Sequence, residues 1–187
     1  MLVVLIYSIV AIFAPFIAPY GEREILGRSF ELWSEKYPLG TDNLGRDMLS
    51  RMIFGARNTI GLALSITILA FLLGGLTGMI AAALGGWVDQ ILSRIVDVLM
   101  SIPSLIFALL ILSIFGTSVP YLIATITVID ATRVFRLARA TAMNVVVMDY
   151  VEVARVRGEK LDWVIRKEIL PNITAPLLAE FGLRFCF

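Results

Sequence analysis

The sequence contains no histidine, and its 187 residues include a single cysteine, Cys186. Without histidine the chain lacks the commonest side chain for acid–base catalysis and metal binding, and it cannot form a serine–histidine triad. One cysteine cannot form an internal disulfide. Charged residues are also scarce, at 17% of the chain, against about a quarter in ordinary soluble domains. We therefore expect no catalytic residue and no metal ligand in this chain.

Two further absences narrow the function. The formal net charge is only +1, which does not fit the strongly basic character of a nucleic-acid-binding protein. The sequence also lacks a Gly-x-x-x-x-Gly-Lys-Ser/Thr phosphate loop, so it has no motif for ATP hydrolysis. Any process that consumes ATP must therefore be driven by another protein.

Apolar residues are abundant, at 59%, and they form long blocks. A membrane helix needs about 20 such residues. We expect a first membrane helix over residues 1–20, because no basic residue precedes the block and no signal-peptide cleavage pattern follows it. Further spans are expected within residues 58–88, 98–115 and 120–140. A fifth apolar run stops at the last residue without a polar flank, which we interpret as a truncated sequence.

The segment 21–57 mixes six acidic and six basic residues with glycine and proline, which predicts a loop and a short amphipathic helix outside the lipid. Within it, residues 38–47 offer glycines, carboxylates and an arginine. Their spacing fits neither a calcium loop nor a phosphate loop. We expect Asp42, Arg46 and Asp47 to form ion pairs at the level of the lipid headgroups instead.

Residues 58–88 carry no charge, and small residues recur at every fourth position within this run. This spacing places them on one face of a helix, where a second helix can approach closely. Glycine is common in membrane helices in general, but five small residues in one register favour a packing interface. These residues are Ala70, Gly74, Gly78, Ala82 and Gly86.

Basic residues are concentrated between positions 133 and 167. The positive-inside rule assigns such a segment to the cytoplasm. Counting back through the spans then puts residues 21–57 outside and the turn after residue 84 inside. Close to that turn, Arg94 and Asp97 are three positions apart and are expected to pair on one helix face.

Residues 149–158 read Asp-Tyr-Val-Glu-Val-Ala-Arg-Val-Arg-Gly, and Ile-Leu-Pro-Asn follows at 169–172. This pattern resembles the EAA loop of ABC importer permeases, with Val153 in place of the first alanine. Residues 38–47 resemble the Pro-Leu-Gly-Thr-Asp-x-x-Gly-Arg-Asp segment of the C-type subunit of dipeptide, oligopeptide and nickel importers. Residues 101–104 are similar to that subunit too, so the resemblance extends over nearly the whole chain.

The resemblance implies an all-α polytopic membrane protein with the fold of a type I ABC importer transmembrane domain. The family core has about six helices, and this chain would end within the fifth. Its permease domain would cover residues 58–187, with a cytoplasmic coupling loop at about 141–171.

The coupling loop would transmit force between a soluble ATPase and the membrane helices. Its first helix would carry Glu152 and Ala154, the latter small enough for a groove of the partner to close over it. Gly158 would form a turn, and Pro171 would begin the next membrane helix. The residues assigned to this role are Glu152, Ala154, Gly158, Ile169, Leu170 and Pro171.

The function implied is that of a permease subunit that moves dipeptides or oligopeptides across the inner membrane of a bacterium by alternating access. A nickel or other small-solute importer of the same subfamily is the alternative, and a channel or a membrane scaffold is a distant one. The chain itself would bind no cofactor. The partners implied are a second homologous permease, two ATP-binding subunits that hold ATP and magnesium, a periplasmic or lipid-anchored solute-binding protein, and membrane lipid.

Three charged residues lie within apolar stretches, namely Asp130, Glu180 and Arg184. Such residues usually face protein or water. Asp130 can pair internally with Arg133, and Glu180 can pair with Arg184 at i, i+4. The alternative is that the carboxylates line the solute path and help to pass a cationic group such as a peptide ammonium.

Overall fold

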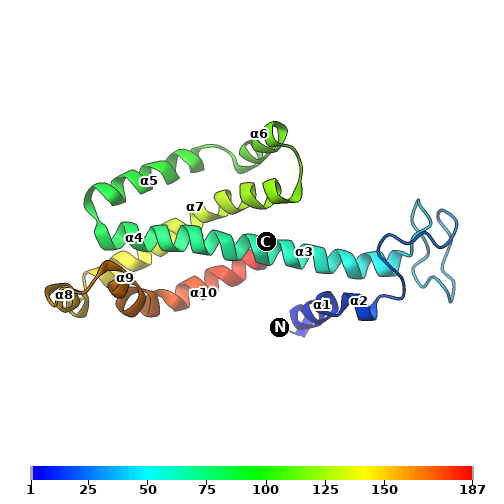
Figure 1. Cartoon of the computed structure of the whole chain (residues 1–187), viewed down its shortest axis with the longest axis horizontal. Helices are drawn as coiled ribbons and strands as arrows, with labels where there is room; N and C mark the ends of the chain where they lie inside the picture. Colours follow the sequence, from blue (N-terminus) through cyan, green and yellow to red (C-terminus); the bar gives the residue numbers. More distant parts are fainter. Residues whose placement is uncertain (1, 187) are drawn as a thin grey trace. The chain divides into compact units, whose positions relative to one another are not determined.

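The computed structural model describes residues 2–186, which are helical apart from one long loop and short connections (Figure 1). Among these residues, extended segments pair at a single bridge between Thr41 and Asp47. The chain divides into two compact units, Met1–Ala63 and Leu64–Phe187. The expected all-α class is therefore confirmed for the part of the chain that is described.

The first apolar block forms two helices, α1 (Leu2–Ile12) and α2 (Ala14–Ile17). Pro15 lies in the first turn of α2, where a proline is tolerated, but its ring is incompatible with a continuous helix through this point. The 11 residues of α1 are too few to cross a bilayer alone, since a crossing takes about 20 residues. The expected single span is thus interrupted at Phe13, and a crossing by the two helices together stays a prediction.

The loop at residues 18–47 is organised around Asp42. Its carboxylate accepts hydrogen bonds from the backbone N–H groups of Leu44 at 2.7 Å and Arg46 at 3.0 Å. The guanidinium groups of Arg46 and Arg51 lie 2.9 and 2.6 Å from it. Desolvation opposes ionisation, but these hydrogen bonds and the charge of Arg46 outweigh it and lower the pKa of Asp42 to about 2. The expected ion pair of Asp42 with Arg46 is therefore present.

Asp47 does not form the expected ion pair among the residues that are described. It immediately precedes α3 (Met48–Ala70), and its carboxylate accepts the backbone N–H of Ser50 at 2.8 Å. Asp47 is thus the N-cap of α3, a position that aspartate favours because it satisfies a free N–H of the first turn. The side chain is almost fully buried, and the prediction of a headgroup-level ion pair was wrong for this residue.

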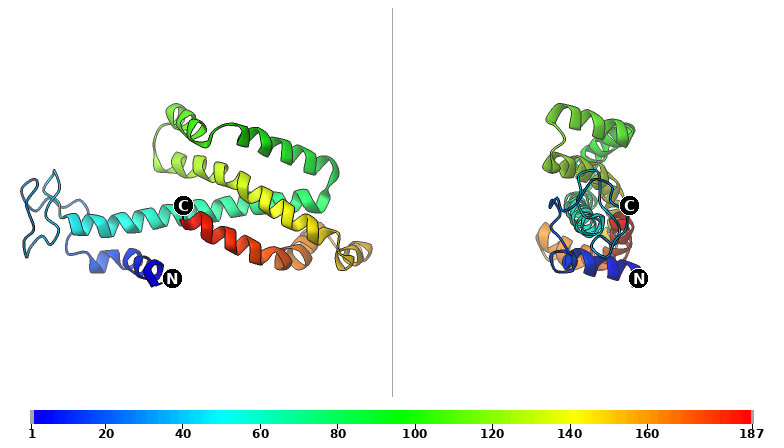
Figure 2. Two further views of the ribbon diagram at one scale, coloured as in Figure 1. Left: turned by 180° about the vertical axis from the view of Figure 1, so that it is seen from behind. Right: turned by 90° about the vertical axis from the view of Figure 1, so that its right-hand side faces the viewer.

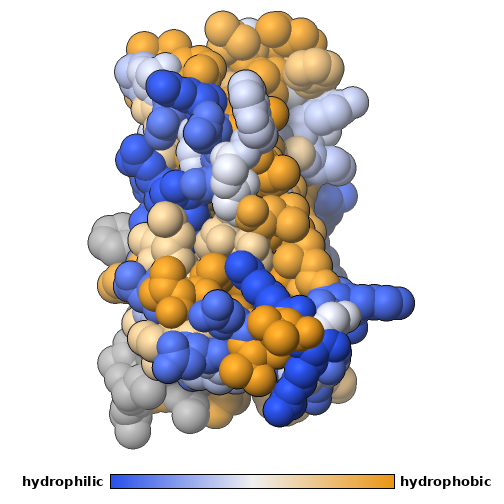
Figure 3. Space-filling view, turned by 90° about the vertical axis from the view of Figure 1, so that its left-hand side faces the viewer, coloured by the Kyte–Doolittle hydropathy of each residue, from blue (hydrophilic) through white to orange (hydrophobic). Residues whose placement is uncertain are grey.

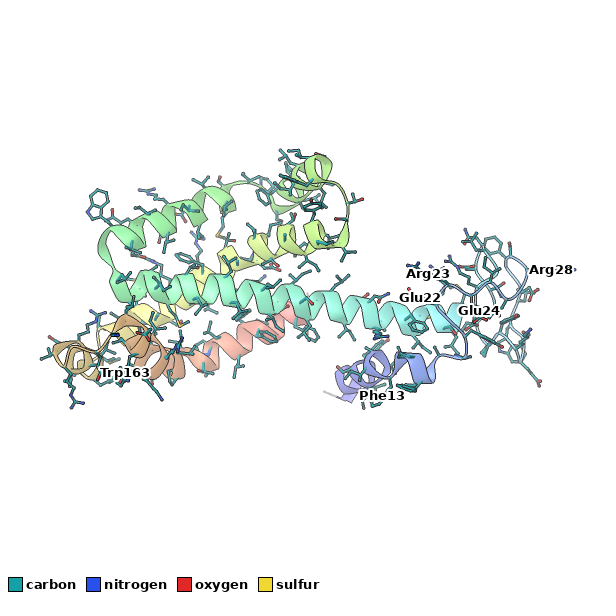
Figure 4. The ribbon with its side chains drawn as sticks, in the orientation of Figure 1. Phe13, Glu22, Arg23, Glu24, Arg28 and Trp163 are labelled. Atoms are coloured by element: carbon teal, nitrogen blue, oxygen red, sulfur yellow. The ribbon has the colours of Figure 1, made fainter. Side chains whose placement is uncertain are left out.

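Two glycines allow the loop to fold back on its own backbone. Gly40 and Gly45 have φ angles of 73° and 76°, which other residues rarely adopt. A methyl group on Gly45 would overlap the carbonyl oxygen of Gly27, and one on Gly40 would overlap that of Glu31. Charged side chains that lie along this loop in Figure 4 include Glu22, Arg23, Glu24 and Arg28.

A continuous helix follows the loop. It consists of α3, a π-helical turn η1 (Phe71–Gly75) and α4 (Leu76–Leu84). With 37 residues it is the one unbent helix, within residues 2–186, that is long and apolar enough to cross a membrane. At 1.5 Å per residue its length is about 55 Å, so it exceeds the hydrocarbon thickness as expected. It ends at Leu84, because Gly85 and Gly86 form a turn with positive φ.

The next span differs from the prediction. α5 (Gly86–Ser101) and α6 (Ser104–Phe115) are joined at Ile102 and Pro103 with a bend of 88°. Only together do they pass as one membrane span, either broken or re-entrant. The expected helix at 98–115 therefore begins earlier and is broken where Pro103 interrupts helical hydrogen bonding. α7 (Val119–Val146) then runs six residues beyond its expected end.

The chain ends with α8 (Asp149–Val156), α9 (Leu161–Val164), a π-helical turn η2 (Ile165–Ile169) and α10 (Leu170–Cys186). In the second unit, α7 contacts η1 and α4, α5, α6 and α10. Figures 1 and 2 show the α5–α6 pair on one side of α7 and α10 on the other. α7 is therefore the central helix of this unit.

Candidate functional site

The segment from α8 to the start of α10 is built around a glycine turn. The N–H of Gly158 donates to the carbonyl of Arg155 at 2.9 Å, and the N–H of Glu159 donates to that of Ala154 at 3.2 Å. This pair of bonds is the Schellman arrangement that ends many helices, with glycine at the left-handed position. Gly158 has φ = 80°. The sharp turn expected at Gly158 is thus present, and α9 with η2 forms a second short helical segment after it.

This segment is fixed to the helices by an apolar core, which we call the coupling core. Val151 and Ala154 of α8 are buried, and Ile169 is fully buried at the end of η2. They share one cluster with residues of α4, α7, α9 and α10. The main members of the cluster are Met79, Ala82, Ala83, Ala138, Ala142, Val145, Val151, Ala154, Val164, Ile165, Ile169, Ile173 and Leu177.

Ala154 therefore has a different environment from the expected one. It is 4% exposed because it packs into the coupling core of its own chain, and a groove of a partner cannot close over it. The outward side of α8 instead presents Glu152, Val153 and Val156, the last with 83% of its surface exposed. Of the other assigned residues, Ile169 is buried, whereas Gly158, Leu170 and Pro171 are exposed.

The exposed surface of α8 and α9 is mixed in polarity. Tyr150, Val153, Val156 and Trp163 are exposed apolar residues of this segment, and Trp163 is labelled at this end of the molecule in Figure 4. Figure 3 views the end of the molecule where α8 lies, and hydrophobic and hydrophilic side chains alternate there. Aromatic side chains and arginine, both present on this segment, are enriched at protein–protein interfaces relative to the rest of the surface.

Sequence reasoning missed a hydrogen bond that joins α8 to α4. Nη2 of Arg155 donates to the carbonyl oxygen of Ala83 at 2.7 Å across 72 positions of sequence. The prediction had treated Arg155 only as part of a basic cytoplasmic segment. Its position in an EAA-like motif gave no indication of a partner so far away in the sequence.

Two ion pairs join α5 to α7. Arg139 pairs with Asp89, and Arg136 lies 3.1 Å from Asp97. Asp97 therefore pairs across helices and not with Arg94, as had been expected. The sequence signal for these pairs was the presence of two acids in the α5 segment and arginines in the α7 segment.

The small-residue stripe lies partly at a helix contact. Gly74 and Gly78 face the backbone of α7, where a methyl group on Gly78 would come 2.7 Å from the carbonyl oxygen of Phe135 and one on Gly74 would overlap that of Ala131. Ala70 and Ala82 are buried. Gly86 does not belong to this face, because the helix ends at Leu84 and Gly86 is exposed at the start of α5.

The charged residues of the two apolar stretches lie together between α7 and α10. Nε of Arg184 is 2.7 Å from Glu180, and its Nη1 is 3.9 Å from Asp130. Arg133 is also 3.9 Å from Asp130. Both internal pairs considered from the sequence are thus present, and Arg184 joins them into one cluster of two acids and two bases.

These features define a helical protein in which a short helix–turn–helix segment is seated on membrane-type helices. The chain belongs to the family described as the inner membrane component of binding-protein-dependent transport systems, whose model matches residues 74–187.

Among curated proteins, the chain is 34% identical to the dipeptide transport system permease protein of Haemophilus influenzae, over 96% of this chain and 63% of that protein. It is 33% identical to the di/tripeptide transport system permease protein of Pseudomonas aeruginosa, over 99% of this chain and 63% of that protein. A peptide transport system permease protein of Escherichia coli is 32% identical over 92% of this chain and 61% of its own length. The chain thus spans a little under two thirds of the relatives that it matches.

Proposed function

We propose that this chain is a membrane-spanning permease subunit of an ATP-driven ABC importer for dipeptides or oligopeptides. It works with a second homologous permease and two ATP-binding subunits, and a solute-binding protein delivers the peptide. ATP and magnesium are bound by the partner subunits. The names of the relatives, which are dipeptide and peptide permeases, favour peptides over the alternative of nickel or another small solute.

The observation that carries this proposal is the seating of α8 on the coupling core. A docking element has to present an outer face to its partner and transmit motion through its inner face. In α8 the inner face is Val151 and Ala154, which are buried against residues of the long helix, α7 and α10. A load on the exposed face, for example at Val156, therefore reaches several helices at once. Alternating access needs such a connection, because ATP is bound far from the solute path.

The orientation of α8 toward the cytoplasm is part of the proposal and is supported by the basic residues between 133 and 167. A single cysteine at Val156, in a chain whose exposed Cys186 is replaced by serine, tests it. In the assembled complex this cysteine should crosslink to an ATP-binding subunit and should react with impermeant reagents only from the cytoplasmic side. A cysteine at Leu32, which is 88% exposed in the loop at residues 18–47, is the matched control and should react only from outside. Labelling of Val156→Cys from outside would contradict the proposal.

The solute class is tested separately by uptake. Proteoliposomes with the full transporter should take up a labelled dipeptide when ATP and the binding protein are supplied. Competition by unlabelled peptides and not by nickel complexes is expected. Uptake of nickel complexes without peptide competition would favour the alternative solute.

We retain a lesser proposal for Asp130, Glu180 and Arg184, namely that they border the solute path and interact with the charged ends of a peptide. Their clustering between α7 and α10 is compatible with this role, since intramembrane charges usually face protein or water. Asp130→Asn and Glu180→Gln should then lower uptake of peptides with a free ammonium group. Unchanged uptake by a fully assembled complex would leave these residues with a purely structural pairing role.

A further inference from the structure

The C-terminal end of α4 has a carbonyl group that α8 satisfies. Ala83 is the penultimate residue of α4, so its carbonyl oxygen has no partner within the helix. Arg155 provides that partner at 2.7 Å. The bond is favourable for two reasons, because the donor is a charged guanidinium and the end of a helix carries partial negative charge.

This hydrogen bond differs in kind from the apolar contact beside it. Ala83 and Ala154 belong to the same coupling core, and apolar contact of this type is non-directional. Small residues such as alanine also leave a smooth surface over which a helix can slide or rotate. A hydrogen bond depends steeply on distance and angle. Arg155 therefore fixes the position of α8 on α4 in a way that the apolar contact alone does not.

Motion delivered to Ala83 would reach two further helices. On one side, η1 and α4 lie against α7 at Gly74 and Gly78, where no room is left for a side chain. On the other side, the turn at residues 85–86 leads directly into α5. Ala83 is therefore the point where α8 is connected to both the α4–α7 contact and the start of α5.

We propose that Arg155 is a positioning residue that latches α8 to the end of α4, so that the two move as one body when the ATP-binding subunits close and open. This inference rests on the proposed function, because it assumes that α8 receives force from those subunits. Arg155 acts through α8 and α4 and does not contact the peptide or ATP. Loss of the latch should uncouple ATP hydrolysis from transport without preventing assembly.

The first test compares Arg155→Gln with Arg157→Gln in the complete transporter, reconstituted in proteoliposomes with its binding protein and a labelled dipeptide. Arg157 is the matched control, because it is the C-cap residue of the same helix, carries the same charge, and has no side-chain hydrogen bond or ion pair among the described residues. The measured quantity is the amount of peptide transported per ATP hydrolysed. Arg155→Gln should lower this ratio by roughly tenfold, the factor that corresponds to one hydrogen bond to a charged group. Arg157→Gln should leave the ratio unchanged, because it removes the same charge from the end of the same helix without breaking the hydrogen bond to Ala83.

Arg155→Lys keeps the charge and a donor on a shorter side chain, so it should restore part of the ratio. If the transporter with Arg155→Gln does not assemble, the transporter with Arg155→Lys is compared with the unmodified one instead. A wild-type ratio in both Arg155 variants would overturn the latch. That result is distinct from failure of the proposed function, in which the unmodified complex itself transports no peptide or binds no ATP-binding subunit.

A distance measurement gives a second, independent readout. Spin labels are placed at Asp149 in α8 and Leu84 at the end of α4, both exposed, after replacement of Cys186 by serine. In the unmodified background the distance between labels should be narrow and equal with ADP and with a non-hydrolysable ATP analogue. With Arg155→Gln it should broaden or differ between the two nucleotides. A distance that changes with nucleotide in the unmodified background would also overturn the proposal.

Discussion

Two connections between helices in this chain are held in place by different forces. The loop at residues 18–47 depends on hydrogen bonds to its own backbone and on the pairing of Asp42 with Arg46 and Arg51. The connection that contains α8, α9 and η2 depends on apolar side chains that it shares with α4, α7 and α10. The loop at residues 18–47 is held in shape by contacts close to it in the sequence. The connection that contains α8, α9 and η2 shares its core with α4, α7 and α10, so it moves only together with those helices. This difference makes the second connection suited to transmit force.

The largest expected effect is that of Ile169→Ala. Ile169 is fully buried in the coupling core, and truncation of a buried isoleucine to alanine costs about 2–5 kcal/mol. The thermal midpoint of the purified complex and its peptide uptake should both fall. Leu170→Ala is the control, since Leu170 is 37% exposed and should cost much less. Equal effects of the two changes would mean that the coupling core is not what holds this connection.

Gly45→Ala should disrupt the other connection alone. The new methyl group would overlap the carbonyl of Gly27 at a positive φ, and the conformation by itself costs about 1–2 kcal/mol. We expect faster proteolysis within residues 18–47 and no change in helical circular dichroism. Gly55→Ala is the control, because a methyl group there meets no atom within 4 Å. Loss of helical signal with Gly45→Ala would show that this loop is not self-contained.

Gly158 offers a comparison within one position. Gly158→Val should destabilise the turn after α8 by about 1–2 kcal/mol, because φ is positive there. Gly158→Asn should cost less, since asparagine tolerates this conformation. Uptake and proteolysis between α8 and α9 measure both. If the two variants behave alike, the conformation of the turn is not what limits the position of α8.

The smallest effect concerns the pKa of Asp42, which is lowered from 3.8 to about 2 in the folded chain. A carboxyl group whose pKa is lowered by folding stabilises the folded state fully above its unfolded pKa, and this contribution is lost as the pH falls through the folded value. Hydrogen exchange in residues 42–46 should therefore differ between the unmodified chain and Asp42→Asn above about pH 4. The difference should shrink toward pH 2. A difference that persists unchanged at pH 2 would contradict the assigned role of the charge.

The sequence predicted features that depend on local chemistry and missed those that depend on distant contacts. Gly158 marks the end of α8 with a residue suited to that position, and this turn was predicted correctly. Pro171 lies at the second residue of α10, but the helix runs into α10 from η2 without a break, so a separate helix start at Pro171 is not seen. Pro15 and Pro103 are present in the sequence too, but the mean hydropathy of an apolar block does not detect a proline within it. The two helix breaks, at Phe13 and at Ile102–Pro103, were therefore missed. The partners of Asp97 and Arg155 were missed, because each lies dozens of residues away and is selected by the packing of α7 and α4.

The hydrogen bond between Arg155 and Ala83 also constrains the membrane topology. Arg155 in α8 and Ala83 in the last turn of α4 are in direct contact. If both lie at the same face of the membrane, the chain between them crosses the bilayer an even number of times. One crossing by α7, which we propose, then requires one more by the α5–α6 pair. On this count we propose that the bend at Pro103 is a break within a single span and not a re-entrant loop, with the turns at residues 85 and 116 on opposite faces of the membrane.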